Sequence, residues 1–288
     1  MTLKITDFIP PIFNKLTHKI SSINKKNLNT TEEYETFQEA DEKCLNNNYK
    51  NLELCNLVAS KTIDFRDSLN KDAKLLNTKF SFLLNAINHI RATKKINTIN
   101  ILDIGGACGT QYFEIRNFIP ETCKINWLVI ETSEMVDAAK AHHLETNELS
   151  FSSELDNLPN IDLIHSSGAL QYTSNPYEWI DYLLKLEAPF IFFNRMIFNT
   201  NENEKDIITI QTSKLADHGP TRTFEKNSEK IIYLPHNTLS FTKFQKKFQK
   251  NYHLNWSFNE DSGMGQMNNQ PLYGCGLFYS RTSETNPL

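Results

Sequence analysis

Two acidic side chains end hydrophobic runs where a parallel sheet would present its carboxyl edge. Asp103 lies at the end of the run INILDI, and Glu131 ends the run INWLVIE. A bend of small residues follows the first run: Gly105, Gly106, Ala107 and Gly109. Ligands of doubly wound α/β sheets bind at the carboxyl ends of strands. Small residues there would let the backbone approach a ligand closely, and the carboxylates would accept hydrogen bonds from it.

The types of these residues favour one ligand class. An acid at the end of the second strand can bind both hydroxyls of a ribose, whereas Asp103 can accept from a ligand ammonium or hold the turn. S-adenosylmethionine offers an ammonium, a sulfonium and a ribose diol without phosphate. A dinucleotide is a weaker alternative, since the GxGxxG pattern would put Ala107 and Thr110 at glycine positions and pyrophosphate beside Asp103. A degenerate scaffold that binds neither is the third alternative.

The surrounding pattern predicts the elements that would position these groups. Short apolar runs alternate with helical stretches from residue 97 onward, which predicts a mainly parallel sheet covered on both faces. The last two runs, HLNWSF and CGLFYSR, have no long helix between them and are expected to pair antiparallel. Residues 1–95 are expected to form a helical N-terminal cap, in which TTEEYETFQEADEKC starts a helix, and residues 96–288 the core. An insertion is expected at about 199–237, and a turn or loop at Gly263 and Gly265.

The same segments resemble class I methyltransferases. ILDIGGACG resembles their motif I, a hydrophobic run followed by DxGxGxG, with Ala107 at the middle glycine. WLVIETSEMVDAAK is similar to their second strand and helix, LSFSSELDNLP to their third strand and adenine loop, and IDLIHSSGALQYTSNP to the strand and loop under the methyl donor. The resemblance implies a Rossmann-like methyltransferase fold, S-adenosylmethionine as cofactor and S-adenosylhomocysteine as product. Besides the bend and the two acids, it implies these cofactor-binding residues: Thr132, Ser153, Glu154, Ser166 and Ser167.

A narrower resemblance covers most of the chain. The segments DFIPPIFNKL, FQEADEKC, GGACGTQYF, SSGALQY, FFNRMIF and ITIQT are similar to a group of bacterial methyltransferases whose genes often lie in surface-polysaccharide or other biosynthetic clusters. This resemblance supports the fold and the cofactor but says little about the substrate; we expect a small-molecule acceptor or a sugar-like or acidic biosynthetic intermediate. The chain departs from the group after the insertion, where YLPHN replaces a Ser-Tyr-Pro-like element, so acceptor specificity is not carried over. A non-catalytic module that binds the cofactor or supports a partner enzyme is the alternative function.

Methyl transfer sets further requirements on side chains. The nucleophile, methyl carbon and sulfur must lie in line, and an oxygen or nitrogen acceptor often needs a base, whereas a carboxylate does not. The candidate catalytic residues are His165, Tyr172, His218 and His236. The candidate acceptor-binding residues are Tyr49, Gln171, Asn194, Arg195, Gln211 and Tyr233. Arg195 interrupts an apolar strand, where a buried cation needs a partner; this partner is either a substrate carboxylate or phosphate or an acid of the helical cap.

Composition excludes several classes of function. A net charge of −4 over 288 residues provides no basic field for nucleic acid. Five cysteines without a CxxC pair favour free thiols in a reducing cytosol. His142 and His143 lack a third ligand, so we expect no metal site. No apolar run is long enough to span a bilayer. We expect a cytoplasmic monomer or homodimer whose N-terminal segment is a surface helix, or alternatively a short amphipathic contact with the inner membrane or a partner.

Overall fold

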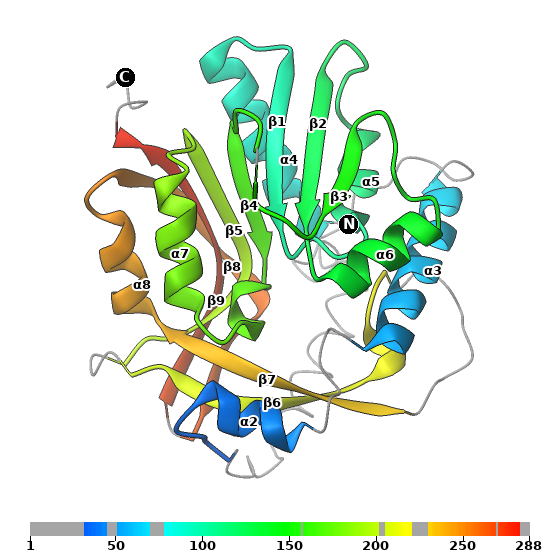
Figure 1. The fold of residues 1–288 in the computed structure, drawn as a ribbon. Coiled ribbons are helices and arrows are strands. Elements are labelled where there is room, and N and C mark those ends of the chain that lie inside the picture. Colours follow the sequence, from blue (N-terminus) through cyan, green and yellow to red (C-terminus); the bar gives the residue numbers. More distant parts are fainter. Residues whose placement is uncertain are drawn as a thin grey trace, which may run out of the picture. The chain divides into compact units, whose positions relative to one another are not determined.

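A mostly parallel sheet carries the candidate site (Figure 1). Five strands lie side by side and parallel in the order β3-β2-β1-β4-β5. They are β1 (Thr98–Ile104), β2 (Lys124–Ile130), β3 (Leu149–Ser152), β4 (Leu163–Ser167) and β5 (Phe190–Asn199). β9 (Gln270–Arg281) pairs antiparallel with β5, and β8 (Tyr252–Met267) pairs antiparallel with β9. This strand arrangement confirms the predicted Rossmann-like α/β fold, including its antiparallel last strand.

The computed structural model describes residues 32–44, 51–69, 78–156, 158–201, 205–220, 230–268 and 270–282. All of them belong to one compact unit, residues 32–288. The N-terminal segment discussed above and Tyr49 lie outside the described residues. The boundary at residue 95 and the limits of the insertion stay predictions. No helix in the described part of the chain combines the length and the hydropathy needed to cross a membrane.

Helices cover both faces of the sheet because its strands are apolar on both sides. In β5, Phe190 and Phe192 pack into one hydrophobic cluster, whereas Ile191 and Phe193 pack into the other. The first cluster lies under α3 (Leu52–Leu69), α4 (Thr78–Lys94), α5 (Thr110–Arg116) and α6 (Ser133–Ala141). The second lies under α7 (Pro176–Lys185) and α8 (Phe241–Phe248). The alternation along β5 therefore fixes two cores, one on each face.

The predicted insertion contains a hairpin that the sequence pattern did not reveal. β6 (Ile207–Lys214) pairs antiparallel with β7 (Ile231–Ser240), and β7 touches β5 through two residue pairs. The hairpin crosses below the carboxyl ends of the parallel strands in the view of Figure 1, with α2 (Phe37–Lys43) beside it. β7 also packs on the short 3₁₀ turn Leu170–Tyr172 that follows β4. This hairpin is the element that brings distant polar residues toward the carboxyl edge of the parallel strands.

Two local expectations were wrong. The first helix begins at Phe37 rather than near Thr31, because the Thr36 side chain caps it by accepting from the amide of Glu39 at 3.1 Å. Gly263 and Gly265 lie within β8, not in a turn, because the strand continues through an irregularity in its pairing between Asn259 and Met264. The reversal of the chain comes later, between Met267 and Gln270.

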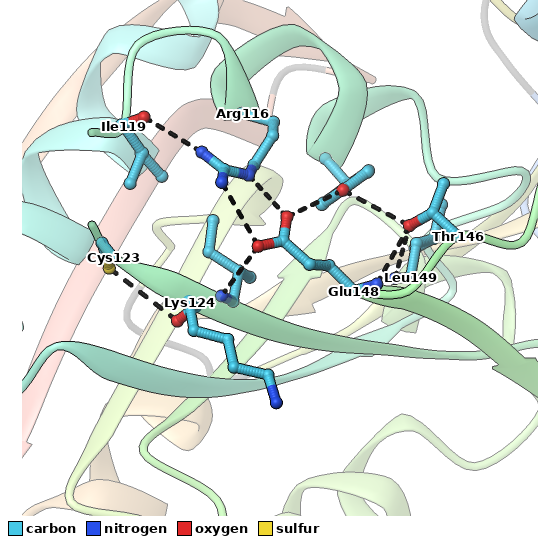
Figure 2. Close-up of polar contacts among 9 residues, drawn as sticks. Arg116, Ile119, Cys123, Lys124, Thr146, Glu148 and Leu149 are labelled. Carbon is cyan, nitrogen blue, oxygen red and sulfur yellow. Dashed lines mark hydrogen bonds and ion pairs between the residues drawn. The ribbon is translucent and has the colours of Figure 1, made fainter. Parts of the chain in front are cut away.

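A polar cluster ties together the opposite, amino edge of the sheet (Figure 2). Arg116 at the end of α5 binds Glu148 before β3 through two nitrogens, at 2.5 and 3.3 Å, and also donates to the carbonyl of Ile119. Glu148 accepts further bonds from Tyr112 and from the amide of Ile125. Burial alone would raise the pKa of Glu148, but these hydrogen bonds hold it below its ordinary value. Because its acceptors are satisfied internally, this cluster stabilises the fold and offers no site.

Candidate functional site

The glycine bend after β1 requires backbone conformations and space that side chains disfavour. Gly105 and Gly109 have φ of +68° and +74°. A Cβ on Gly105 would lie 2.1 Å from the Cβ of Ala169, so the bend lies directly against the loop after β4. Ala107 adopts φ of +48° despite its side chain, which costs roughly 1 kcal/mol relative to glycine. The bend is therefore a close-approach turn, as the sequence predicted.

Glu131 lies at the carboxyl end of β2, beside this bend. Its Oε1 accepts from the amide of Ala107 and its Oε2 from the amide of Thr132, both at 3.0 Å. The residue is partly exposed. Burial raises the pKa of Glu131, the two amide bonds lower it, and the negative charge of Asp103 raises it further, with a net upward shift. Each oxygen has a second acceptor position, so the carboxylate can still bind two adjacent hydroxyl donors.

Asp103 is occupied within the protein. It has no exposed surface, and its oxygens accept from Trp127 Nε1 at 3.0 Å and pair with His165 Nδ1 at 2.8 Å. The other nitrogen of His165 lies 3.2 Å from Asn194 Oδ1. Asp103 also supports the bend, because a Cβ on Gly106 would lie 2.2 Å from its Oδ2. Of the two roles that the sequence left open, this geometry fits the holding of the turn.

The buried network accounts for three residues that the sequence placed in the site. His165 is fully buried with both ring nitrogens engaged, an arrangement typical of a structural residue. Asn194 is also buried. Trp127, which the sequence did not single out, completes this hydrogen-bonded row of side chains across β2, β1, β4 and β5. The only sequence signal was a tryptophan in the middle of the second apolar run.

The other predicted cofactor residues lie along the same edge. Thr132 caps α6 by accepting from the amide of Met135. Ser166 is buried and donates to the carbonyl of Ile104, which ties β4 to β1. The Ser167 hydroxyl is buried and has no hydrogen-bond partner within the described residues. Ser153 and Glu154 are exposed after β3. Their binding of the cofactor stays a prediction.

A second polar group forms where the hairpin meets the turn after β4. Tyr172 donates to Gln211 Oε1 at 2.5 Å, and its ring packs edge-on against His236 with centroids 5.1 Å apart. Burial lowers the pKa of His236 to about 4. Burial raises the pKa of Tyr172, against opposing effects of Arg195 and Gln211. The structure thus brings together three predicted residues from segments far apart in sequence; we call Tyr172, Gln211 and His236 the hairpin cluster.

His218 lies next to the same hairpin face. Its Nε2 is 2.8 Å from the hydroxyl of Ser213 on β6. Burial lowers the pKa of His218, Asp217 opposes this, and Lys61 and Arg195 add to it. Lys61, on α3, is 4% exposed and donates to the carbonyls of Ala216 and His218 at 2.8 and 2.7 Å. Sequence reasoning missed this lysine, although a charged residue among Val58, Thr62 and Phe65 on the apolar helix face was a usable signal.

Two predicted acceptor residues, Arg195 of β5 and Tyr233 of β7, have exposed side chains. Arg195 is exposed rather than buried, because β5 is irregular there and the residue has φ of +55°. Tyr233 is 43% exposed, and strand alternation puts it on the hairpin face opposite to His236. Gln171 is buried and bonds to the backbone around Arg195. No group of three or more metal-ligating side chains is found within the described ranges.

Comparisons with known proteins add a partial likeness. A scan against family models and a search of curated proteins find no match. Solved structures with similarity include a S-adenosylmethionine-dependent methyltransferase from Clostridium acetobutylicum, at 9% identity and a TM-score of 0.42, covering 71% of this chain and 92% of that chain. Human N-acetylserotonin methyltransferase in complex with S-adenosylmethionine has 15% identity and a TM-score of 0.42, over 70% of this chain and 51% of that chain. An amino pentose methyltransferase from Micromonospora echinaspora has 12% identity and a TM-score of 0.39, covering 72% of this chain and 92% of that chain.

At these identities and scores, the fold assignment rests on the strand order and pairing within this chain. Those features define a Rossmann-like α/β protein in which the carboxyl edge of the parallel strands carries a glycine bend and one partly exposed carboxylate.

Proposed function

We propose that this protein is a methyltransferase that uses S-adenosylmethionine and acts on a small-molecule biosynthetic intermediate, sugar-like or acidic. The observation that carries the proposal is the state of Glu131. Its two oxygens are fixed by the amides of Ala107 and Thr132, 3.0 Å away in each case, and each oxygen keeps a second acceptor position. Two such positions suit the 2′- and 3′-hydroxyls of an adenosyl ribose.

The charge of this edge supports a donor without phosphate. Glu131 lies beside the bend that would have to cradle a pyrophosphate in a dinucleotide enzyme, and Asp103 adds a second negative charge beneath it. Like charges close together oppose phosphate binding. S-adenosylmethionine instead supplies a methyl group activated by a positively charged sulfonium. The residues that fit it are Glu131 at the ribose and the bend from Gly105 to Gly109, with Ser167 available as an additional donor.

Calorimetry with the full chain tests the proposal. We expect S-adenosylmethionine and S-adenosylhomocysteine to bind and NAD not to bind. Glu131→Gln should weaken binding of S-adenosylhomocysteine by about 1–3 kcal/mol, the value of a charged hydrogen-bond pair. Asp137→Asn is a matched control, because Asp137 is an exposed acid on α6.

Three outcomes would decide against the proposal or part of it. Binding of NAD alone would exclude the donor, and equal affinity of the Glu131 variant and wild type would remove Glu131 from the ribose. If S-adenosylmethionine binds but no metabolite fraction causes S-adenosylhomocysteine to form, the non-catalytic module would be favoured.

A further inference from the structure

An irregularity in β5 turns Arg195 out of an apolar strand. The pairing of β5 with β9 shifts register between Phe193 and Met196, and Arg195 has φ of +55°. A side chain in this region of backbone space is strained, and such strain persists where surrounding contacts enforce it. Bulges next to binding sites commonly re-aim one side chain.

Dedicated hydrogen bonds hold this bulge. Gln171 is 2% exposed; its Nε2 donates to the carbonyl of Arg195 at 3.3 Å, and its Oε1 accepts from the amide of Ile197. Glu260 Oε1 accepts from the amide of Arg195 at 2.6 Å. The amide of Gly168 donates to the carbonyl of Asn194 at 2.9 Å. A buried amide and a carboxylate therefore fix the backbone that presents Arg195.

The bulge places Arg195 beside the loop that joins the bend to the hairpin cluster. A Cβ on Gly168 would lie 3.4 Å from the Cβ of Arg195. The positive charge of Arg195 acts on Tyr172 and His218: it opposes the rise that burial causes in the pKa of Tyr172, and it adds to the fall that burial causes in the pKa of His218. Within the described part of the chain, no carboxylate lies within ion-pair distance of the guanidinium. The guanidinium is thus exposed on the side of Tyr172 and His218, while the nearby Glu260 carboxylate accepts from the backbone amide of Arg195.

His236 completes the group as a buried, neutral ring. It is 6% exposed and packs on Tyr172. Its ring nitrogens form no hydrogen bond with a described residue. With a pKa of about 4 it is uncharged at neutral pH, so one ring nitrogen has a free lone pair. A neutral imidazole near a reacting hydroxyl can accept its proton.

The same loop connects this group with the proposed donor site. Ala169 contacts Gly105 of the bend, and its carbonyl accepts from the amide of Tyr172 at 3.0 Å. The donor edge and the hairpin cluster therefore lie on either side of one short loop, as a two-substrate reaction requires.

We infer that the acceptor is a hydroxy acid, whose single carboxylate is bound by Arg195 while His236 accepts the proton of the hydroxyl that is methylated. The inference rests on the proposed methyltransferase function. The hydroxyl proton moves to the imidazole, the oxygen–methyl bond forms as the sulfur–methyl bond breaks, and the electron pair stays on sulfur. The imidazolium then releases its proton to water.

The charge balance favours a carboxylate over a phosphate. One guanidinium with a neutral histidine matches one negative charge, whereas a phosphate monoester carries about −1.5 to −2 at neutral pH; the planar fork itself can bind either group bidentately. Lys61 adds a nearby cation, but its ammonium is directed at the carbonyls of Ala216 and His218.

The test uses the full chain with methyl-labelled S-adenosylmethionine and three fractions of a metabolite extract: carboxylates without phosphate, phosphorylated compounds and neutral compounds. We expect labelled methyl ethers in the carboxylate fraction. Arg195→Gln and Arg195→Gly should each raise KM for that fraction about tenfold or more; glycine tolerates the positive φ, so that variant retains the bulge. His236→Gln should lower kcat with KM nearly unchanged. Arg66→Gln and His253→Gln, at sites away from this group, are controls.

A second measurement, which does not depend on turnover, tests the binding of the carboxylate to Arg195. With S-adenosylhomocysteine bound, the carboxylate fraction should protect Arg195 from phenylglyoxal, measured by peptide mass spectrometry, and the other fractions should not. Label confined to phosphorylated or neutral compounds, or no label and no protection despite cofactor binding, would overturn the inference. Failure to bind S-adenosylhomocysteine would instead remove the proposed function itself.

Discussion

Replacing Asp103 by asparagine tests whether this carboxylate has a structural role or binds the ligand. In the wild type, one oxygen of Asp103 accepts from Trp127 and the other pairs with His165, and the Asp103 side chain is fully buried. Asparagine keeps one acceptor and puts an amide nitrogen against the second donor. His165 can relieve part of this conflict, because a change of tautomer would let its Nδ1 accept while its Nε2 donates to Asn194.

The expected cost follows from these contacts. One buried donor left without an acceptor costs about 1–3 kcal/mol, and the loss of the charge from the remaining bond adds about 1 kcal/mol. We therefore expect the free energy of unfolding to fall by about 2–4 kcal/mol. For a chain of this size, Tm should fall by about 2–4 °C for each kcal/mol.

Urea and thermal denaturation give the stability, and calorimetry at a temperature where the variant is folded gives the Kd for S-adenosylhomocysteine. Asp137→Asn is again the matched control. A variant with wild-type Tm and a Kd more than about tenfold weaker would refute the reasoning, since Asp103 would then act on the ligand ammonium and not on the turn.

Three further predictions concern packing and protonation. Ala107→Gly should raise the free energy of unfolding by up to about 1 kcal/mol, because it relieves a φ of +48°; a lower Tm would contradict this. Gly276→Ala should lower Tm strongly, because its Cβ would lie 2.1 Å from the ring of Phe258, which stacks on Phe82 at 3.7 Å; an unchanged Tm would show that the ring can move. His236 has a pKa of about 4 when folded and about 6.5 when unfolded, so its stabilising effect is complete above pH 6.5 and is lost as the pH falls toward 4. Urea denaturation of His236→Gln should therefore show a pH slope in that window shallower than wild type by up to about 1.4 kcal/mol per unit, and identical slopes would disprove the assignment.

The parallel sheet could be predicted because its signals are local. Apolar runs, small-residue bends and intervening helical stretches each occur within a few residues. The β6–β7 hairpin escaped prediction because polar residues interrupt the apolar pattern of its strands and because no two-residue turn joins them; the chain between Lys214 and Ile231 is much longer.

The site residues show where local pattern fails. Asp103 and His165 each end an apolar run, but only the register of β1 with β4, which places them side by side, shows that they bind one another. Arg195 looked buried because it interrupts an apolar strand, and a single irregularity in pairing reverses its side chain. Such features depend on contacts between distant segments, which one sequence does not display.

The limited strand pairing between the β6–β7 hairpin and the central sheet has a consequence for engineering. It joins the central sheet through two residue pairs, Phe198–Leu239 and Asn199–Ser240, while its own ladder supplies most of its backbone pairing. Chimeras spliced at Asn199 and Ser240 would therefore exchange this segment between related chains with few severed strand contacts. Such chimeras offer a way to change the acceptor specificity while the sequence from β1 to β4 stays unaltered.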